Sequence, residues 1–259
     1  MATANLMLHR GAREVSREEL AHIPLPPATR SWAPVGHSRV LDTTLATLKE
    51  TGFVCDKMRL ALSADGRRFF GTLDLTTELS SDGIVTLAVG VRNSIDKTFP
   101  MGFCAGSRVF VCDNLAFRSE LMVRRKHSIN GAANFSADIA TAVMGLNAFK
   151  ESETARIAAM AESEMSNERA ESFILRAAVE RGIISLRQIP AIIREWREPR
   201  HEVFEPRTAW SLFNAFTSGI ADMQKRNPAE LARRTMRLSA LLTPEPVTET
   251  TPPPVELAA

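Results

Sequence analysis

The chain has 259 residues, of which 44% are hydrophobic and 24% charged, so it is long enough to bury a core as one large domain or two small ones. Its formal charge of +2 is too small to indicate nucleic-acid binding by itself. Three of the acidic residues, Glu245, Glu249 and Glu256, lie in the last 17 positions, which hold no lysine or arginine. Without them, 32 basic residues face 27 acidic ones, and this mildly basic balance suits a polyanionic partner.

The three cysteines, Cys55, Cys104 and Cys112, are an odd number without a closely spaced pair. This pattern argues against a disulfide framework and against a zinc site, and it fits a reducing compartment. No apolar run approaches the ~18 residues of a membrane span, and the first residues are too polar for a signal peptide. We therefore expect a cytoplasmic protein that has no membrane partner, metal or cofactor.

The N-terminal part of the chain predicts little regular structure. Residues 1–38 contain Pro24, Pro26, Pro27 and Pro34 and indicate an irregular arm, with a short helix near residues 13–21. Residues 41–50 place Leu41, Leu45 and Leu48 on one face and predict a helix that ends at Gly52.

From residue 53 to residue 127 the hydrophobic pattern has a period of two, which is typical of strands. The pairs Asp65-Gly66 and Asp82-Gly83 supply turn signals between them. These features predict an antiparallel meander of about five strands.

The rest of the chain favours helices, over residues 135–242. We expect a long charged helix over 151–181 with a break near Ser166-Asn167, a helix over 208–224, and one that begins at Asn227-Pro228 and ends near Leu242. Residues 243–259, acidic and rich in proline, are predicted to be disordered. The prediction is thus an α+β chain with a single domain over residues 39–242.

No phosphate-binding loop, dinucleotide fingerprint, zinc-protease or nucleophile-elbow motif occurs, so function must be sought in polar clusters. The first cluster is Arg92-Asn93-Ser94-Ile95-Asp96-Lys97 at a strand's end. Arg92 and Lys97 could bind phosphate, with Asn93 and Ser94 completing the hydrogen bonds. The alternative is an ordinary turn that these polar side chains stabilise.

The second cluster is Cys112-Asp113-Asn114. Asp113 is a candidate metal ligand, general base or orienting group, although one carboxylate is thin support for metal chemistry. His127 is the candidate partner in acid–base chemistry, whereas the simpler interpretation of Asp113-Asn114 is again a turn. Cys112 follows three hydrophobic residues and is interpreted as a buried filler.

The third cluster is Arg124-Arg125-Lys126-His127. In a strand, alternation sends Arg124 and Lys126 to one face and Arg125 and His127 to the other, so at least two cations reach an open face. Such a stripe suits phosphates, and it is equally typical of a charged edge strand that prevents aggregation. Six phenylalanines in this region could stack on bases or form the core: Phe69, Phe70, Phe99, Phe103, Phe110 and Phe117.

The stretches RNSIDK, GSRVFVCDNLAF, KHS and TAWSLFNAFT resemble a phage/plasmid-like family of unknown function (domain of unknown function 932), over about Trp32 to Thr217. The resemblance carries no activity. It implies a setting on mobile elements, beside recombination and replication genes, and it suggests that the shared residues form one site.

These observations lead to one leading hypothesis and two alternatives. The leading one is a nucleic-acid-binding protein of a mobile element that takes single-stranded DNA, through Arg92, Asn93, Lys97, Asn114, Arg124, Arg125 and Lys126. An annealing role would require a homo-oligomer, and recombination proteins of the element are expected partners. The alternatives are an enzyme acting on nucleic acid or nucleotides through Asp113 and His127, and a protein-interaction module without nucleic-acid affinity.

Overall fold

The computed structural model describes residues 12–80, 83–109, 114–220 and 228–242. Within these ranges, side chains are not described for residues 109, 114–122, 228–229 and 231–232. Six strands form one antiparallel sheet in the order of the chain, so that each strand pairs with the next. They are β1 (Arg13–Glu14), β2 (Cys55–Leu62), β3 (Arg68–Glu78), β4 (Val85–Ser94), β5 (Met101–Val109) and β6 (Asn114–Arg125). The predicted meander is confirmed.

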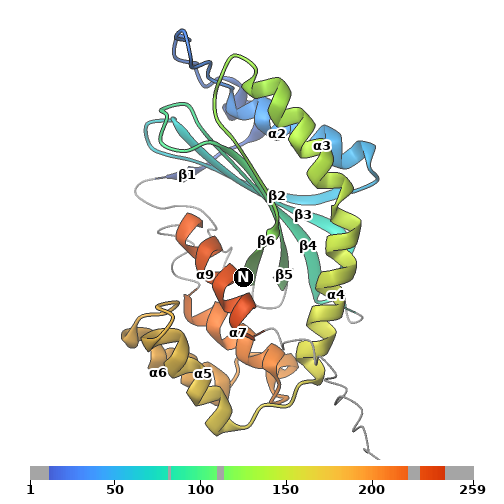
Figure 1. Cartoon of the computed structure of the whole chain (residues 1–259), viewed down its shortest axis with the longest axis vertical. Coiled ribbons are helices and arrows are strands. Elements are labelled where there is room, and N and C mark those ends of the chain that lie inside the picture. Colours follow the sequence, from blue (N-terminus) through green and yellow to red (C-terminus); the bar gives the residue numbers. More distant parts are fainter. Residues whose placement is uncertain (1–11, 81–82, 110–113, 221–227, 243–259) are drawn as a thin grey trace, which may run out of the picture.

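Helices surround this sheet and make up most of the C-terminal half (Figure 1). The α-helices are α1 (Arg17–Ala21), α2 (His37–Glu50), α3 (Gly131–Met144), α4 (Leu146–Glu162), α5 (Asn167–Val179), α6 (Ile189–Arg197), α7 (Ala209–Ile220) and α9 (Pro228–Leu242). Two short 3-10 helices, η1 (Leu186–Gln188) and η2 (Glu202–Phe204), precede α6 and α7. The expected α+β class, with strands first and a helical C-terminal half, is confirmed.

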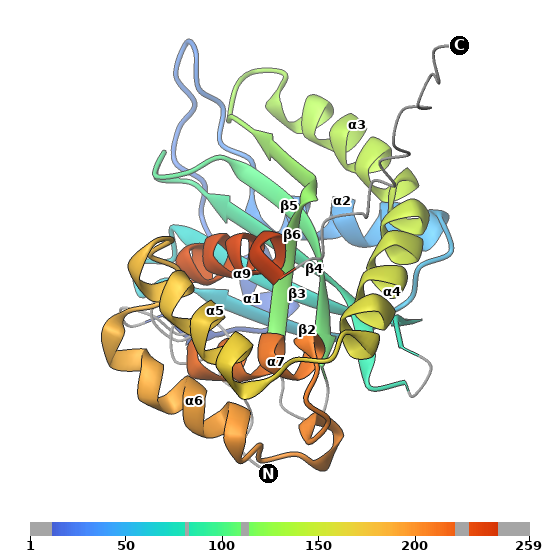
Figure 2. The ribbon, with the colours of Figure 1, turned by 60° about the horizontal axis from the view of Figure 1, so that its bottom comes forward.

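The two faces of the sheet differ in character, because successive residues of a strand point to opposite sides. The helix face carries buried apolar side chains such as Phe69, Leu73 and Val89, against which α2, α3 and α4 pack. The opposite face carries Phe70 and Arg92, which stand in register across β3 and β4. Figure 2 shows α9 near β6, which it contacts.

A buried ion pair lies on the opposite face. Arg108 donates from Nε to Asp74 Oδ1 at 2.6 Å, with 0% and 1% of the two side chains exposed, and Arg59 lies 3.6 Å from the same carboxylate. Since a buried charge is costly unless it is paired, this arrangement requires all its members and helps to fix the register of the sheet.

The N-terminal arm contains more structure than the sequence indicates. Its two-residue strand β1 pairs with Leu62 and Ala61 of β2 and adds a sixth strand to the predicted five. Helix α1 lies within residues 13–21, where a short helix was predicted, and has a capping box between Ser16 and Glu19. Helix α2 begins at residue 37, four residues before the expected start, and ends as predicted before Gly52, whose φ is 85°.

Candidate nucleic-acid interface

Arg92, Gly102 and Arg124 form a row across three strands on the opposite face of the sheet. Arg92 of β4 pairs with Gly102 of β5, which pairs with Arg124 of β6. Adjacent strands lie about 5 Å apart, so the two arginines start roughly 10 Å from one another. Gly102 has no side chain to separate them, and a Cβ built on it would lie 3.0 Å from Arg92 Nε. Arg92 therefore lies directly over the glycine, in the space between the two strands.

Two phenylalanines lie beside this row. The Phe70 and Phe99 rings have centroids 5.3 Å apart at an angle of 44°, and the Arg92 guanidinium lies 5.2 Å from the Phe99 centroid. Both rings are only partly buried. The arrangement is an arginine held against a partly exposed aromatic pair.

The charge of the row is not neutralised within the part of the chain that the structure describes, where neither Arg92 nor Arg124 has an ion-pair partner. Burial and the positive charge of Arg124 both lower the pKa of Arg92 from its ordinary value. An arginine side chain nevertheless stays a cation in a protein. Two cations that repel one another, one partly exposed and the other exposed, favour the binding of an anion between them. We call Arg92, Gly102, Arg124, Phe70 and Phe99 the arginine row.

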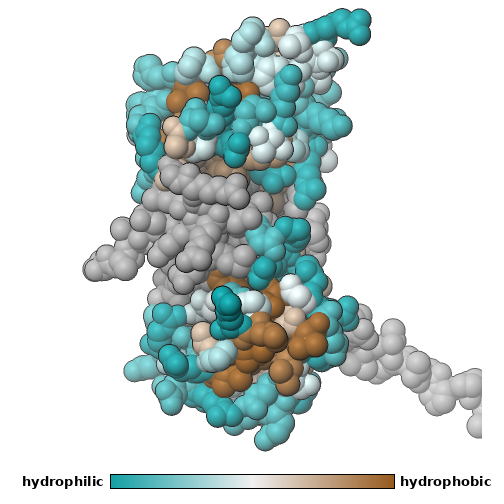
Figure 3. Space-filling view, turned by 90° about the vertical axis from the view of Figure 1, so that its left-hand side faces the viewer, coloured by the Kyte–Doolittle hydropathy of each residue, from teal (hydrophilic) through white to brown (hydrophobic). Residues whose placement is uncertain are grey.

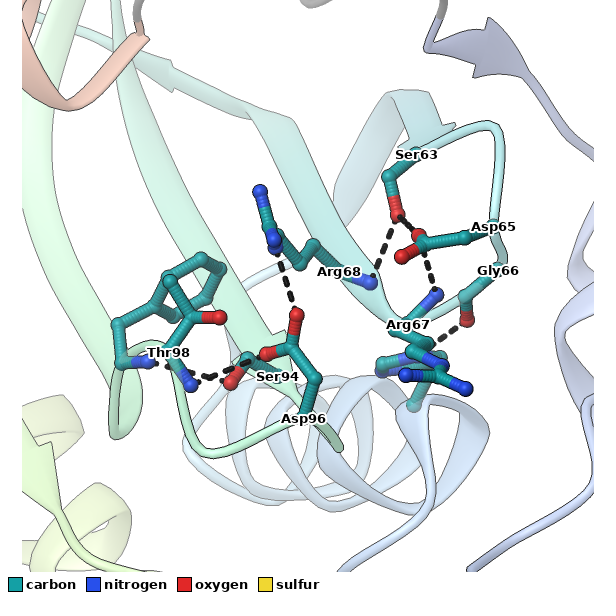
Figure 4. Close-up of polar contacts among 10 residues, drawn as sticks. Ser63, Asp65, Gly66, Arg67, Arg68, Ser94, Asp96 and Thr98 are labelled. Atoms are coloured by element: carbon teal, nitrogen blue, oxygen red, sulfur yellow. Dashed lines mark hydrogen bonds and ion pairs between the residues drawn. The ribbon is translucent and has the colours of Figure 1, made fainter.

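Local hydrogen bonds stabilise the turn after β4, and Figure 4 shows those among Arg68, Asp96 and Thr98. Ser94 Oγ accepts from the Phe99 amide, and Asp96 accepts from the Thr98 amide and from Arg68 Nε at 2.8 Å. Burial would raise the pKa of Asp96, but hydrogen bonds from Thr98, Arg68 and Ser94 outweigh it and lower that pKa. The turn interpretation thus describes Ser94 and Asp96.

Asn93 and His127 lie apart from the arginine row, buried toward the arm. Asn93 donates from Nδ2 to the carbonyl of Val35 at 2.8 Å and to His37 Nδ1 at 3.0 Å, while His127 Nδ1 accepts from the Val35 amide at 3.0 Å. Together they satisfy both backbone groups of Val35 and so attach the arm to the ends of β4 and β6. Both are at least nine-tenths buried.

The hydrogen bonds of this cluster require neutral histidines. Because His37 Nδ1 accepts from Asn93, the ring proton is on Nε2, which donates to the carbonyl of Gly66 at 3.1 Å. Burial lowers the pKa of His37 to about 4, and burial likewise lowers the pKa of His127. Within the described residues, His127 Nε2 and Asn93 Oδ1 are buried without a hydrogen-bond partner.

The remaining predicted residues are divided among different surroundings. Lys97 is exposed, with Nζ 4.7 Å from the Trp32 ring centroid. Arg125 points to the helix face and forms an ion pair with Asp138 of α3, whereas Lys126 is exposed. Arg124 and Arg125 thus follow the predicted alternation.

Asn114 begins β6, and its side chain lies outside the description; Asp113 and Cys112 lie outside the described residues altogether. Their predicted roles stay predictions. Burial raises the pKa of the Cys55 thiol to about 11 and that of Cys104 to about 12, so neither is an activated nucleophile at neutral pH.

Among the residues that the structure describes, no group of three or more His, Cys, Asp or Glu side chains could hold a metal ion. Over the same residues, no helix combines the length and the apolar character that crossing a membrane requires.

Sequence reasoning missed the contributions of Trp32, Val35, His37 and Gly102. The centroids of the Trp32 and His127 rings are 6.3 Å apart, and the ammonium group of Lys97 lies over the Trp32 ring. No local pattern marks such residues, because their role comes from segments that are distant in sequence. The glycine could have been noticed, since a glycine inside a strand often marks a close approach of other groups.

Comparison with known proteins gives a family and no activity. The family model described as "Domain of unknown function (DUF932)" matches residues 25–242, so the chain belongs to this family. No curated protein and no solved structure shows significant similarity to the chain.

Proposed function

We propose that this member of the DUF932 family binds single-stranded nucleic acid, DNA in the first place, at the arginine row. The proposal rests on one observation: Arg92 and Arg124 share a row across Gly102, with no acidic partner in the described part of the chain, beside the Phe70–Phe99 pair. Guanidinium groups bind phosphate oxygens in a bidentate manner, which suits the backbone of a nucleic acid.

The aromatic pair favours a single strand over a duplex. A base can stack on a phenylalanine only when the ring face of the base is free. In a duplex, the neighbouring bases cover that face. Phe99 stands beside Arg92, so one nucleotide could place its phosphate on the guanidinium and its base on the ring. Lys97 and Lys126, both exposed near the ends of β4 and β6, would extend the contact to neighbouring phosphates.

The wider setting is part of the same proposal. Recombination or replication on a phage or plasmid would supply single strands, and annealing would require several copies to form an extended binding surface. An enzyme that uses Asp113 and His127 has weaker support, since His127 Nδ1 is occupied by the Val35 amide.

The test is binding of a fluorescein-labelled oligodeoxythymidine of about 20 nucleotides, followed by fluorescence anisotropy at low salt. We expect binding to the wild type and a loss of about tenfold or more for Arg124→Gln, because a phosphate contact disappears while exposed Arg124 supports no packing. Phe99→Leu should weaken binding as well, by about 1–3 kcal/mol per stacked base.

Lys150→Gln is the matched control, since Lys150 is an exposed cation on α4, away from the arginine row. It should bind like the wild type. Absence of binding to any single strand at low salt would contradict the proposal, and so would an equal loss in Lys150→Gln and Arg124→Gln.

A further inference from the structure

An exposed aliphatic patch covers part of the α5–α6 region, away from the arginine row. Leu175 and Val179 lie four positions apart on the outer side of α5 and are 53% and 70% exposed, and Leu186 of η1 is 66% exposed. Figure 3 shows hydrophobic surface gathered at this end of the molecule and bordered by hydrophilic residues. Ile189 and Ile193 of α6, partly buried, pack beneath it against the core.

The core does not need these side chains. Helix α5 buries Ala170, Ile174 and Ala177 on its inner side, so Leu175 and Val179 are additional to the face that attaches the helix. An apolar cluster left open to water while the helix is already anchored is typical of an interaction surface.

The charges around the patch indicate what covers it. From Leu175 to Arg194 the sequence has four arginines and one glutamate, Glu180, which is paired with Arg176. Arg181, Arg187 and Arg194 are exposed, and none has an ion-pair partner in the described ranges. The stretch of residues 175–194, which contributes the patch, therefore carries a net positive charge.

A second copy of the same patch would be a poor partner, because an interface between identical surfaces would place these arginines against one another. A partner whose apolar stripe is flanked by carboxylates would satisfy both features at once.

We propose that the α5–α6 patch, defined by Leu175, Val179 and Leu186 and accompanied in the same stretch of sequence by the exposed Arg181, Arg187 and Arg194, binds an acidic amphipathic helix of another protein. The patch and the arginine row lie at opposite ends of the molecule: β6 leads into α3 at one end in Figure 1, and α5 and α6 lie at the other. A partner could thus be held while the arginine row stays open. The inference does not depend on the nucleic-acid proposal.

The probe is a synthetic helical peptide of about 18 residues, with leucine along one stripe, glutamate elsewhere and a fluorescein label. Binding to the full chain is followed by fluorescence polarisation. We expect saturable binding to the wild type, about tenfold weaker for Val179→Glu and for Arg181→Glu/Arg187→Glu, and no binding of the same peptide with lysine in place of glutamate.

Two control variants locate the site. Met144→Glu removes a 76% exposed side chain from α3 in the same manner as Val179→Glu, and Arg124→Gln removes a cation from the arginine row; both should bind like the wild type. Folding of each variant is checked by circular dichroism.

Four results would overturn the inference. The first three are failure of the glutamate peptide to bind the wild type, equal binding by Val179→Glu and the wild type, and a concentration-dependent dimer that Val179→Glu abolishes. A fourth is binding that appears only after removal of residues 243–259, because the acidic segment of this chain would then be the occupant.

Discussion

At the scale of single residues, Lys97 has an unusual backbone conformation. Its φ is 67°, the one positive value for a non-glycine among the described residues, and its ammonium group lies over the Trp32 ring. A side chain in this left-handed region costs about 1–2 kcal/mol. The strained backbone at Lys97 thus places its ammonium group against Trp32 of the arm, two residues before Phe99.

Comparing two substitutions at position 97 separates strain from the contact with Trp32. Lys97→Gly and Lys97→Ala both remove the ammonium group, but only glycine adopts a positive φ without strain. We expect Lys97→Gly to be more stable than Lys97→Ala by about 1 kcal/mol in urea unfolding. As a control, Ala140→Gly at an exposed helical position should instead destabilise the protein. Equal stability of Lys97→Gly and Lys97→Ala would contradict the strained conformation assigned to Lys97.

His37 makes stability depend on pH. Burial lowers its pKa to about 4 in the folded state, from an ordinary value of 6.5. The unfolded chain therefore binds more protons between these values, and stability falls as the pH is lowered through this window. For His37 alone the loss between pH 7 and pH 5 is about 2 kcal/mol, and His127, whose pKa burial also lowers, adds to it.

Urea midpoints at pH 7 and pH 5 measure this effect. His37→Gln should reduce the difference between the urea midpoints measured at pH 7 and pH 5, because glutamine does not titrate. Asp96 acts outside the window: its lowered pKa gives stability that is lost only as the pH falls below about 4. A midpoint of the wild type that does not change between pH 7 and pH 5 would show that the histidines are not buried as described.

At the scale of the elements, local sequence patterns predicted most helices and strands, whereas features that depend on the pairing of distant strands were missed. The break near Ser166-Asn167 and the helix beginning at Pro228 both follow from capping residues, which act locally. The two-residue strand β1 was missed because so short a segment has no periodicity, and only its pairing with β2 defines it.

Close packing of α6 against α7 depends on Gly219. A Cβ at this position would overlap Ile192 Cγ1, so the two helices approach where a side chain is absent. Gly219→Ala should destabilise the protein by about 1–3 kcal/mol, as overpacking of a core does. The destabilisation by Gly219→Ala should be smaller in a protein that also has Ile192→Ala, because the shorter side chain provides room. If the effects of the two substitutions on stability were fully additive, this packing would be contradicted.

At the scale of the whole molecule, the sheet brings together what the sequence separates. Arg92 and Arg124 were both predicted to contact phosphate, but their adjacency depends on the register of β4, β5 and β6. An irregularity in the β5–β6 pairing between Cys104 and Gly106 helps to set that register, and no sequence pattern indicates it. Alternation along β4 then points Asn93 toward the arm, to which it is hydrogen-bonded, while Arg92 lies partly exposed on the opposite face of the sheet.

The salt dependence of single-strand binding tests the phosphate site most directly. Each phosphate contact contributes about 0.7 to the slope of log affinity against log salt for a single strand. We predict that Arg92→Gln and Arg124→Gln each reduce the magnitude of the slope by about that amount, and that the double variant loses about twice as much. Slopes that equal the wild-type slope in all three variants would show that these arginines do not contact phosphate, and would contradict the account.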